Sequence, residues 1–254
     1  MATRNTTKHF IPLESNPELF TELIHRLGMS KKLAFHDMYT LDDETTKYIP
    51  RPTLALVIIV PAPSDYIKLI EEEEEEEEEK DKFPHDLSGD DEDAVFYCQT
   101  IGNACGLFAI LHAVSNGDTR GFIEPNTHIS NLVTKLAPLN RAQRIQVLEQ
   151  DSQLEEAHAS VASRGDTAPP EDATIPAPYA FMAFAKSHKS GKLYQLEGCR
   201  KGPVDLGVVL GPDEDLLSGK ALGAVKEFVD RAGKGVRFGY SAMALSVTGE
   251  EEEV

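Results

Sequence analysis

Residues 53–60 constrain the fold more than any other part of this 254-residue sequence. They read Thr-Leu-Ala-Leu-Val-Ile-Ile-Val and are closed by Pro61. The run has no polar side that could face water, and its length suits a strand, whereas a helix would be longer. We therefore expect a central strand that is covered on both of its faces.

Segments with helix and strand patterns alternate irregularly along the rest of the chain. The motif Ser15-Asn16-Pro17-Glu18 is typical of a helix start, since it combines a capping residue, an early proline and a glutamate three residues after the serine. Further helices are expected from about residue 104, over residues 140–163 and around residues 213–232. Strands are expected over residues 179–185, 192–198 and 236–247, the first two as a hairpin. This order predicts an α+β fold in one domain, with a central, mostly antiparallel sheet flanked by helices.

The acidic residues are concentrated in two runs. Of the net charge of −18, residues 71–93 hold fifteen acids and two lysines, and residues 250–253 are all glutamate. Nine consecutive glutamates repel one another and bury no apolar surface, so we predict a disordered acidic insertion at residues 71–93. The domain then spans residues 8–248, with an acidic tail at 249–254. Because the remainder is nearly neutral and has no basic face, we do not expect nucleic acid as a partner.

Cysteine usage and hydropathy indicate the compartment. There are three cysteines, Cys98, Cys105 and Cys199, a small and odd number that does not suit a disulfide framework. Such cysteine usage is typical of a reducing compartment, so we expect a cytoplasmic protein, with the nucleus open as a second location. No apolar run approaches the roughly 20 residues of a membrane helix, and the N-terminus lacks the apolar stretch of a secretory signal. Neither Cys98 nor Cys199 has a His or Cys partner at zinc-ligand spacing, so no metal or other cofactor is expected.

The window Gln99-Thr100-Ile101-Gly102-Asn103-Ala104-Cys105-Gly106 has the features of a nucleophile site. It places Cys105 at the start of a helix, where free N–H groups favour a thiolate. Gln99, six residues earlier across a Gly-Asn turn, can fold back so that its amide and the N–H of Cys105 form an oxyanion hole. A free cysteine that merely packs on a helix is the alternative at this point, because free cysteines are usually buried.

Several separated motifs resemble the ubiquitin carboxyl-terminal hydrolase family and occur in the family's order. They are LESNP at 13–17, FHDMY at 35–39, IPRP at 49–52, QTIGNACG at 99–106, LYQLEG at 193–198, GPVDLG at 202–207 and the final strand at 238–245. The resemblance implies a papain-like α-β-α domain with a knotted chain. It also implies a monomeric thiol protease that needs no cofactor and hydrolyses esters, thioesters and amides at the C-terminal glycine of ubiquitin, in ubiquitin-dependent protein catabolism.

The resemblance also implies roles for individual residues. Cys105 is the expected nucleophile and Gln99 the oxyanion stabiliser, while Glu197 stands where the family usually has the aspartate that orients a histidine. That histidine should precede a Phe in a strand, and the matching position holds Ala180. If the hairpin folds symmetrically about residues 188 and 189, Ala180 lies directly opposite Glu197, as a base and its orienting acid should.

Other histidines are poor replacements for the missing base. His188 lies eight residues along the strand from position 180, about 26 Å away. His112 lies two helical turns from Cys105, roughly 10 Å along the axis. Nothing in the sequence ties His158 to the sulfur. Two hypotheses therefore stand: a deubiquitinating enzyme whose crossover loop is residues 164–178, and a family member that binds ubiquitin with little turnover because of Ala180. The sequence leaves open whether Ala180 is natural or engineered.

Overall fold

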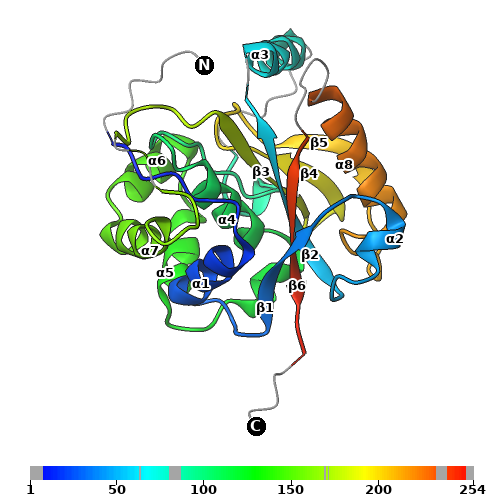
Figure 1. Ribbon diagram of the computed structural model, residues 1–254, viewed down its shortest axis with the longest axis horizontal. Helices are drawn as coiled ribbons and strands as arrows, with labels where there is room; N and C mark the ends of the chain where they lie inside the picture. The colour runs from blue at the N-terminus through cyan, green and yellow to red at the C-terminus, as the bar shows by residue number, and fades with distance from the viewer. Residues whose placement is uncertain are drawn as a thin grey trace.

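Six strands form one antiparallel sheet in the order β1-β6-β2-β3-β4-β5 (Figure 1). The computed structural model describes residues 8–62, 64–79, 87–168, 170, 172–232 and 239–249. The strands are β1 (Leu33–Met38), β2 (Thr53–Pro61), β3 (Tyr179–Lys186), β4 (Lys192–Leu196), β5 (Val204–Val209) and β6 (Ser241–Val247). The α+β fold predicted from the sequence is thereby confirmed.

Helices cover both faces of this sheet (Figure 1). On one side lie α1 (Pro17–Leu27), α4 (Cys105–Ser115), α5 (His128–Leu136), α6 (Arg141–Glu149) and α7 (Ser152–Ala162). On the other lie α8 (Gly219–Ala232) and the short α2 (Asp43–Thr46), while α3 (Ser64–Glu79) sits at one end. Two 3₁₀ segments, Gly89–Asp91 and Gly117–Phe122, connect the elements. None of the helices in the described ranges is long and apolar enough to span a bilayer.

The central strand β2 is buried on both faces, as its sequence predicts. Val57 and Ile59 belong to the hydrophobic core under α1 and α4, whereas Leu56 and Ile58 belong to the core under α8. Alternating residues of one strand thus reach two separate cores. The apolar run needs no polar face because each face is covered by helices.

The predicted helix boundaries are partly right. Asn16 caps α1 by accepting hydrogen bonds from the N–H groups of Glu18 and Leu19, and Gly28 ends the helix in the left-handed conformation, with φ 109°. The single helix expected over residues 140–163 is wrong. It is two helices, because Asp151 accepts from the N–H of Leu154 and starts a new helix there. The final strand begins at Ser241, and residues 236–238 lie outside the described ranges.

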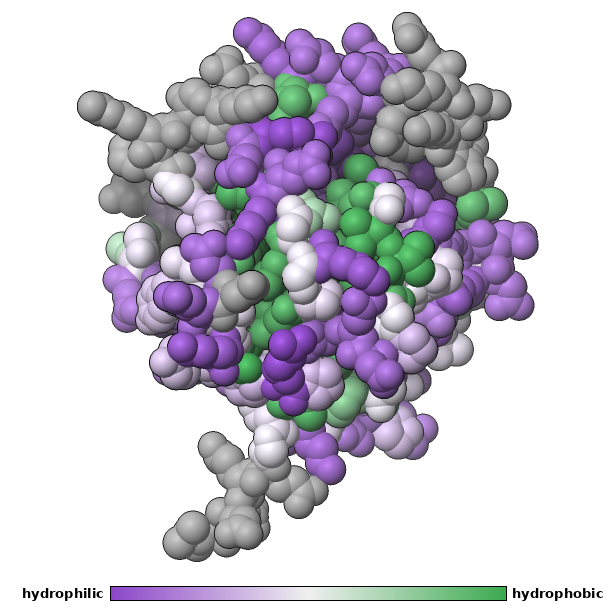
Figure 2. Space-filling view, turned by 90° about the vertical axis from the view of Figure 1, so that its right-hand side faces the viewer, coloured by the Kyte–Doolittle hydropathy of each residue, from purple (hydrophilic) through white to green (hydrophobic). Residues whose placement is uncertain are grey.

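The prediction of disorder over residues 71–93 is wrong for the parts that the structure describes. The glutamate run continues α3 as far as Glu79, and Glu74 is buried and accepts a hydrogen bond from the N–H of Lys201 at 2.7 Å. Glu92 is also buried, in an ion pair with Arg144. Hydrophilic residues gather at the top of Figure 2, the end where Figure 1 places α3. Residues 80–86 of the run, and residues 250–254 of the tail, lie outside the described ranges.

Candidate active site

Cys105 is the first residue of α4, and its sulfur lies against the backbone of β3. The Sγ atom is 4.0 Å from the carbonyl oxygen of Tyr179, and the N–H of Phe181 acts on it as a hydrogen-bond donor. The residue is half-buried, whereas the helix behind it is buried along its whole length. Since residues 179 and 181 flank position 180, the sulfur sits beside the position at which a histidine was expected.

The approach of Cys105 to β3 occurs where β3 and β4 have stopped pairing. Their last paired residues toward this end are Ala183 and Leu196. Beyond that pair, the carbonyl of Gly198 accepts a hydrogen bond from the N–H of Gln99 at 2.8 Å. The loop before Cys105 therefore follows the end of β4 while the sulfur contacts β3.

The predicted pairing of Ala180 with Glu197 is wrong by two residues. The hairpin closes with the N–H of Ser187 donating to the carbonyl of Lys192 at 2.7 Å, and Gly191 takes a left-handed φ of 74°. This turn lies one residue later than a symmetric turn about residues 188 and 189, so Glu197 falls level with Met182. A shift of two keeps every side chain on its predicted face. Extended past the last paired residues, this register makes Ala180 and Glu197 diagonal neighbours on one face, a separation that long side chains can bridge.

Gln99 is held inside the loop that leads to Cys105. Its side chain is only 9% exposed, and its Nε2 donates to the carbonyl of Ile101 at 3.0 Å. A Cβ added to Gly198 would lie 2.8 Å from the Cβ of Gln99, so only glycine allows this close approach. A side-chain amide has two N–H hydrogens, and this bond uses one of them.

Glu197 is a buried carboxylate with two donors. Tyr66 on α3 donates its hydroxyl to Oε2 at 2.8 Å, and Nε of Arg200 lies 3.4 Å from the same oxygen. Burial raises the pKa of Glu197 above its usual value, while Arg200 and Tyr66 act in the opposite direction. Neither partner was predicted from the sequence. Arg200 is only three residues from Glu197, but nothing in the sequence links Tyr66 to this site.

Each of the other histidines considered as a base has its own partner elsewhere. His188 lies on the β3–β4 turn, with Nε2 2.8 Å from Nη1 of Arg120. His112 is fully buried and accepts from the N–H of Tyr97 at 3.0 Å. Burial lowers its pKa to about 3, so the imidazole is neutral at pH 7. Nε2 of His158 lies 2.8 Å from the carbonyl oxygen of Ile11.

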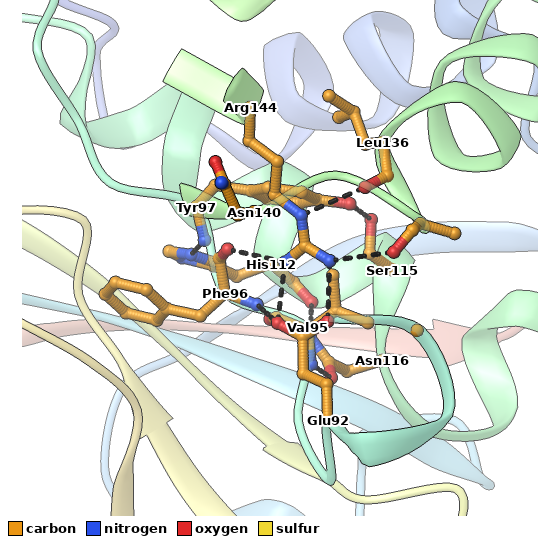
Figure 3. A network of polar contacts seen from close by, with 12 residues as sticks. Glu92, Val95, Phe96, Tyr97, His112, Ser115, Asn116, Leu136, Asn140 and Arg144 are labelled. Carbon is orange, nitrogen blue, oxygen red and sulfur yellow. Dashed lines mark hydrogen bonds and ion pairs between the residues drawn. The ribbon is translucent and has the colours of Figure 1, made fainter. Parts of the chain in front are cut away.

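A buried ion pair supports the segment that runs into the site (Figure 3). Two guanidinium nitrogens of Arg144 contact the two carboxylate oxygens of Glu92, at 2.6 and 2.7 Å. The same side chain donates to the carbonyls of Phe96 and Leu136, at 3.1 and 3.0 Å. The pair therefore fixes residues 92–96, which lead directly to Gln99.

Asn103 ties the loop at residues 164–178 to the nucleophile segment. Its Nδ2 donates to the carbonyls of Ala173 and Ile175, at 2.8 and 2.9 Å, and its Oδ1 accepts from the N–H of Ala177 at 2.9 Å. Its φ of 58° is left-handed, a conformation that Asn tolerates better than most residues. The described residues of the loop form no helix or strand, as predicted. The sequence showed Asn103 only as a turn residue.

Comparison with known proteins agrees with the family resemblance. The sequence pattern of ubiquitin carboxyl-terminal hydrolase, family 1, matches residues 10–230. A ubiquitin carboxyl-terminal hydrolase from Aplysia californica is 34% identical over 227 residues, which cover 88% of this chain and 96% of that protein. Ubiquitin carboxyl-terminal hydrolase isozyme L1 from Equus caballus is 29% identical over 234 residues, covering 92% of this chain and 96% of that protein.

The fold has a close counterpart among solved structures. The Trichinella spiralis UCH37 catalytic domain bound to ubiquitin vinyl methyl ester superimposes with a TM-score of 0.68 at 20% identity, covering 96% of this chain and 98% of that one. With the sequence matches, this places the chain in a class of thiol-dependent deubiquitinating hydrolases. The chain belongs to the ubiquitin carboxyl-terminal hydrolase family 1.

The thiol of Cys105 should react slowly at neutral pH. Burial raises its pKa to about 11, although the N–H groups of Gly106, Phe181 and Cys105 itself lower it. Because the thiolate is the nucleophile, the rate of alkylation by iodoacetamide should rise about tenfold per pH unit between pH 7 and 10. Peptide mass spectrometry would follow Cys105 separately from Cys98 and Cys199. A rate that is already constant below pH 8 would show that the thiolate is stabilised without a histidine.

Proposed function

We propose that this chain binds ubiquitin and that Cys105, Gln99 and Glu197 occupy the nucleophile, oxyanion-stabilising and orienting positions of its hydrolase site. Position 180, held by Ala180, is the position of the base. The observation that carries this assignment is the contact of the Cys105 sulfur with the backbone on both sides of residue 180. The diagonal position of Glu197 on the same face of the sheet supports it.

The proposed reaction uses these side chains in order. The thiolate of Cys105 attacks the carbonyl carbon of the C-terminal glycine of ubiquitin, and the oxyanion is stabilised by the N–H of Cys105 and the amide of Gln99. The leaving group departs with a proton, and water then hydrolyses the thioester. With a methyl group at position 180, no side chain there can take the thiol proton or give it to the leaving group. Both transfers then fall to water, and turnover is slow.

The remaining features of the proposal follow the family resemblance. The chain acts as a monomer with one catalytic domain over residues 8–248, follows the papain-like knotted path, and uses no nucleic-acid partner. Its location is cytoplasmic, with the nucleus as a further site. The loop at 164–178, held by Asn103, restricts substrates to ubiquitin carrying small or flexible leaving groups.

Ubiquitin should bind this chain whether or not it is turned over. We expect a one-to-one complex by titration calorimetry, and the same complex with Cys105→Ala, since that change removes reactivity and leaves the surrounding surface in place. Ubiquitin lacking its last two residues should bind more weakly, because it cannot reach Cys105. No heat and no change in ubiquitin chemical shifts at high concentration would overturn the proposal.

A further inference from the structure

Arg200 is a buried cation between two carboxylates. Its side chain is 2% exposed and reaches Glu73 of α3 through Nη2 at 2.7 Å, and the residue lies four positions after the last residue of β4. The side-chain Nε of Arg200 lies 3.4 Å from the carboxylate of Glu197, and the backbone N–H of Arg200 donates to the backbone carbonyl of Glu197 at 2.9 Å. A buried charge is stable only when it is paired, so the position of this guanidinium is fixed by those two acids.

The surroundings of Glu197 give Arg200 a particular importance. Among the groups that act on this carboxylate, Tyr66 is a neutral donor, Glu74 and the thiol of Cys105 are acidic, and Arg200 supplies the positive charge. A buried carboxylate near other acids takes up a proton unless a cation is close. Arg200 is therefore the charged group that favours the ionised form of Glu197, beside the hydrogen bond from Tyr66.

Helix α3 holds Arg200 in place. Glu73 is shared between Arg200 and Arg231 of α8, whose Nη1 lies 3.2 Å from it. The next residue, Glu74, is buried and accepts from the N–H of Lys201 at 2.7 Å. Two adjacent members of the glutamate run thus anchor the segment that follows β4. Their neighbours Glu72 and Glu75 are exposed.

We propose that Arg200 is a positioning residue for this site: held by Glu73 of the acidic helix, it keeps the carboxylate of Glu197 ionised and oriented. The proposal rests on the proposed function only where it takes Glu197 as the orienting acid. A protonated Glu197 would lose one acceptor oxygen and could not hold an imidazole N–H in the same way. The acidic run is then a structural part of the site wall.

The first test needs no enzymatic activity. Arg200→Gln leaves Glu197 buried without its cation, so its pKa, which burial already raises, should rise further above the unfolded value. Ionising it then costs stability, and the loss of melting temperature should grow as the pH rises from 5 to 8. The double variant Arg200→Gln/Glu197→Gln should melt higher than Arg200→Gln, with a shift that does not change with pH. Lys220→Gln, which removes an exposed cation 3.0 Å from Glu214, is the matched control and should show no such trend.

The second test uses the Ala180→His background with a fluorogenic ubiquitin amide. Adding Arg200→Gln should lower kcat at pH 7 at least about tenfold with little change in KM, and activity should recover toward pH 9, where a buried glutamate ionises. Adding Glu197→Gln instead should give a loss that does not recover. Glu73→Gln keeps an acceptor oxygen but removes a negative charge that competes with Glu197 for Arg200. The acid limb of the pH–rate profile, where activity falls as Glu197 becomes protonated, should therefore move to lower pH. Glu75→Gln should leave the acid limb at the same pH.

The outcomes separate this inference from the proposed function. If Ala180→His is inactive both alone and combined with the Arg200, Glu197 and Glu73 variants, the proposed function fails. The melting experiment still decides the role of Arg200. If Arg200→Gln does not fold, the double variant and Glu73→Gln carry the test. The inference is overturned if the effect of Arg200→Gln on melting is independent of pH, or if the acid limb stays fixed in both Arg200→Gln and Glu73→Gln.

Discussion

Replacing Ala180 with histidine is expected to raise the hydrolysis of a ubiquitin C-terminal amide by about 10²–10⁴-fold, the usual range for general acid–base catalysis. The sulfur of Cys105 already lies against the backbone next to position 180, although Ala180 itself packs in the core under α8, so the new imidazole has to turn toward the end of β3 to meet the nucleophile. An imidazolium there would also favour the thiolate, whose pKa is now raised to about 11. The pH at which alkylation of Cys105 levels off should therefore fall in the variant.

Glu197 is placed to orient that histidine. It lies diagonally from position 180 on the same face, and its carboxylate has acceptor sites left beyond those used by Tyr66 and Arg200. Ala180 is packed in a core that also contains Tyr66 and Met182, so the larger ring has to displace neighbours. We therefore expect Ala180→His to be faster but less stable to unfolding than the parent chain.

Three variants control this experiment. Ala180→Gln adds similar bulk without a base and should remain slow. Cys105→Ala should abolish the residual activity in both backgrounds. A parent chain that is already fast, together with no gain from Ala180→His, would mean that another residue is the base and that position 180 has been assigned wrongly.

Replacing Arg144 with methionine is expected to lower the free energy of unfolding by about 3–5 kcal/mol, because it leaves Glu92 buried without its partner. The variant also loses the hydrogen bonds to the carbonyls of Phe96 and Leu136. For a chain of this size the melting temperature should drop by about 10 °C, which thermal or denaturant unfolding would measure.

A surface ion pair provides the comparison for this prediction. Arg26 contacts Glu22 at 2.7 Å, but its side chain is 48% exposed, so Arg26→Met should cost no more than about 1 kcal/mol. The double variant Glu92→Gln/Arg144→Met should be more stable than Arg144→Met, since no unpaired charge stays buried. Equal losses for Arg144→Met and Arg26→Met would show that the buried pair adds nothing.

Local patterns predicted much of this fold. Residues 53–60 carry their apolar faces in the sequence, and the helix starts at Asn16 and Cys105 are marked by neighbouring residues. The hairpin was predicted on the right strands but two residues out of register, because the turn is set by backbone hydrogen bonds at Ser187 and by the left-handed Gly191.

Partners distant in the sequence account for what the sequence could not predict. A run of nine glutamates has no reason of its own to be ordered. In the structure Glu73 and Glu74 meet Arg200 and Lys201, which are 127 residues further along the chain, and Glu92 meets Arg144. The sequence does not show these pairings, so the role of α3 beside Glu197 became visible only in three dimensions.

The anchoring of the loop at residues 164–178 beside the nucleophile segment has a mechanical consequence. One end is tied to the body by Thr167, whose N–H donates to Glu14 at 3.0 Å, and the other end by the three hydrogen bonds of Asn103. Asn103 is also only two residues from Cys105. Lifting the loop to admit a bulky group must break those bonds and release a left-handed turn next to the sulfur. If the loop restricts substrates as proposed, opening it and disturbing the aim of the nucleophile are a single movement.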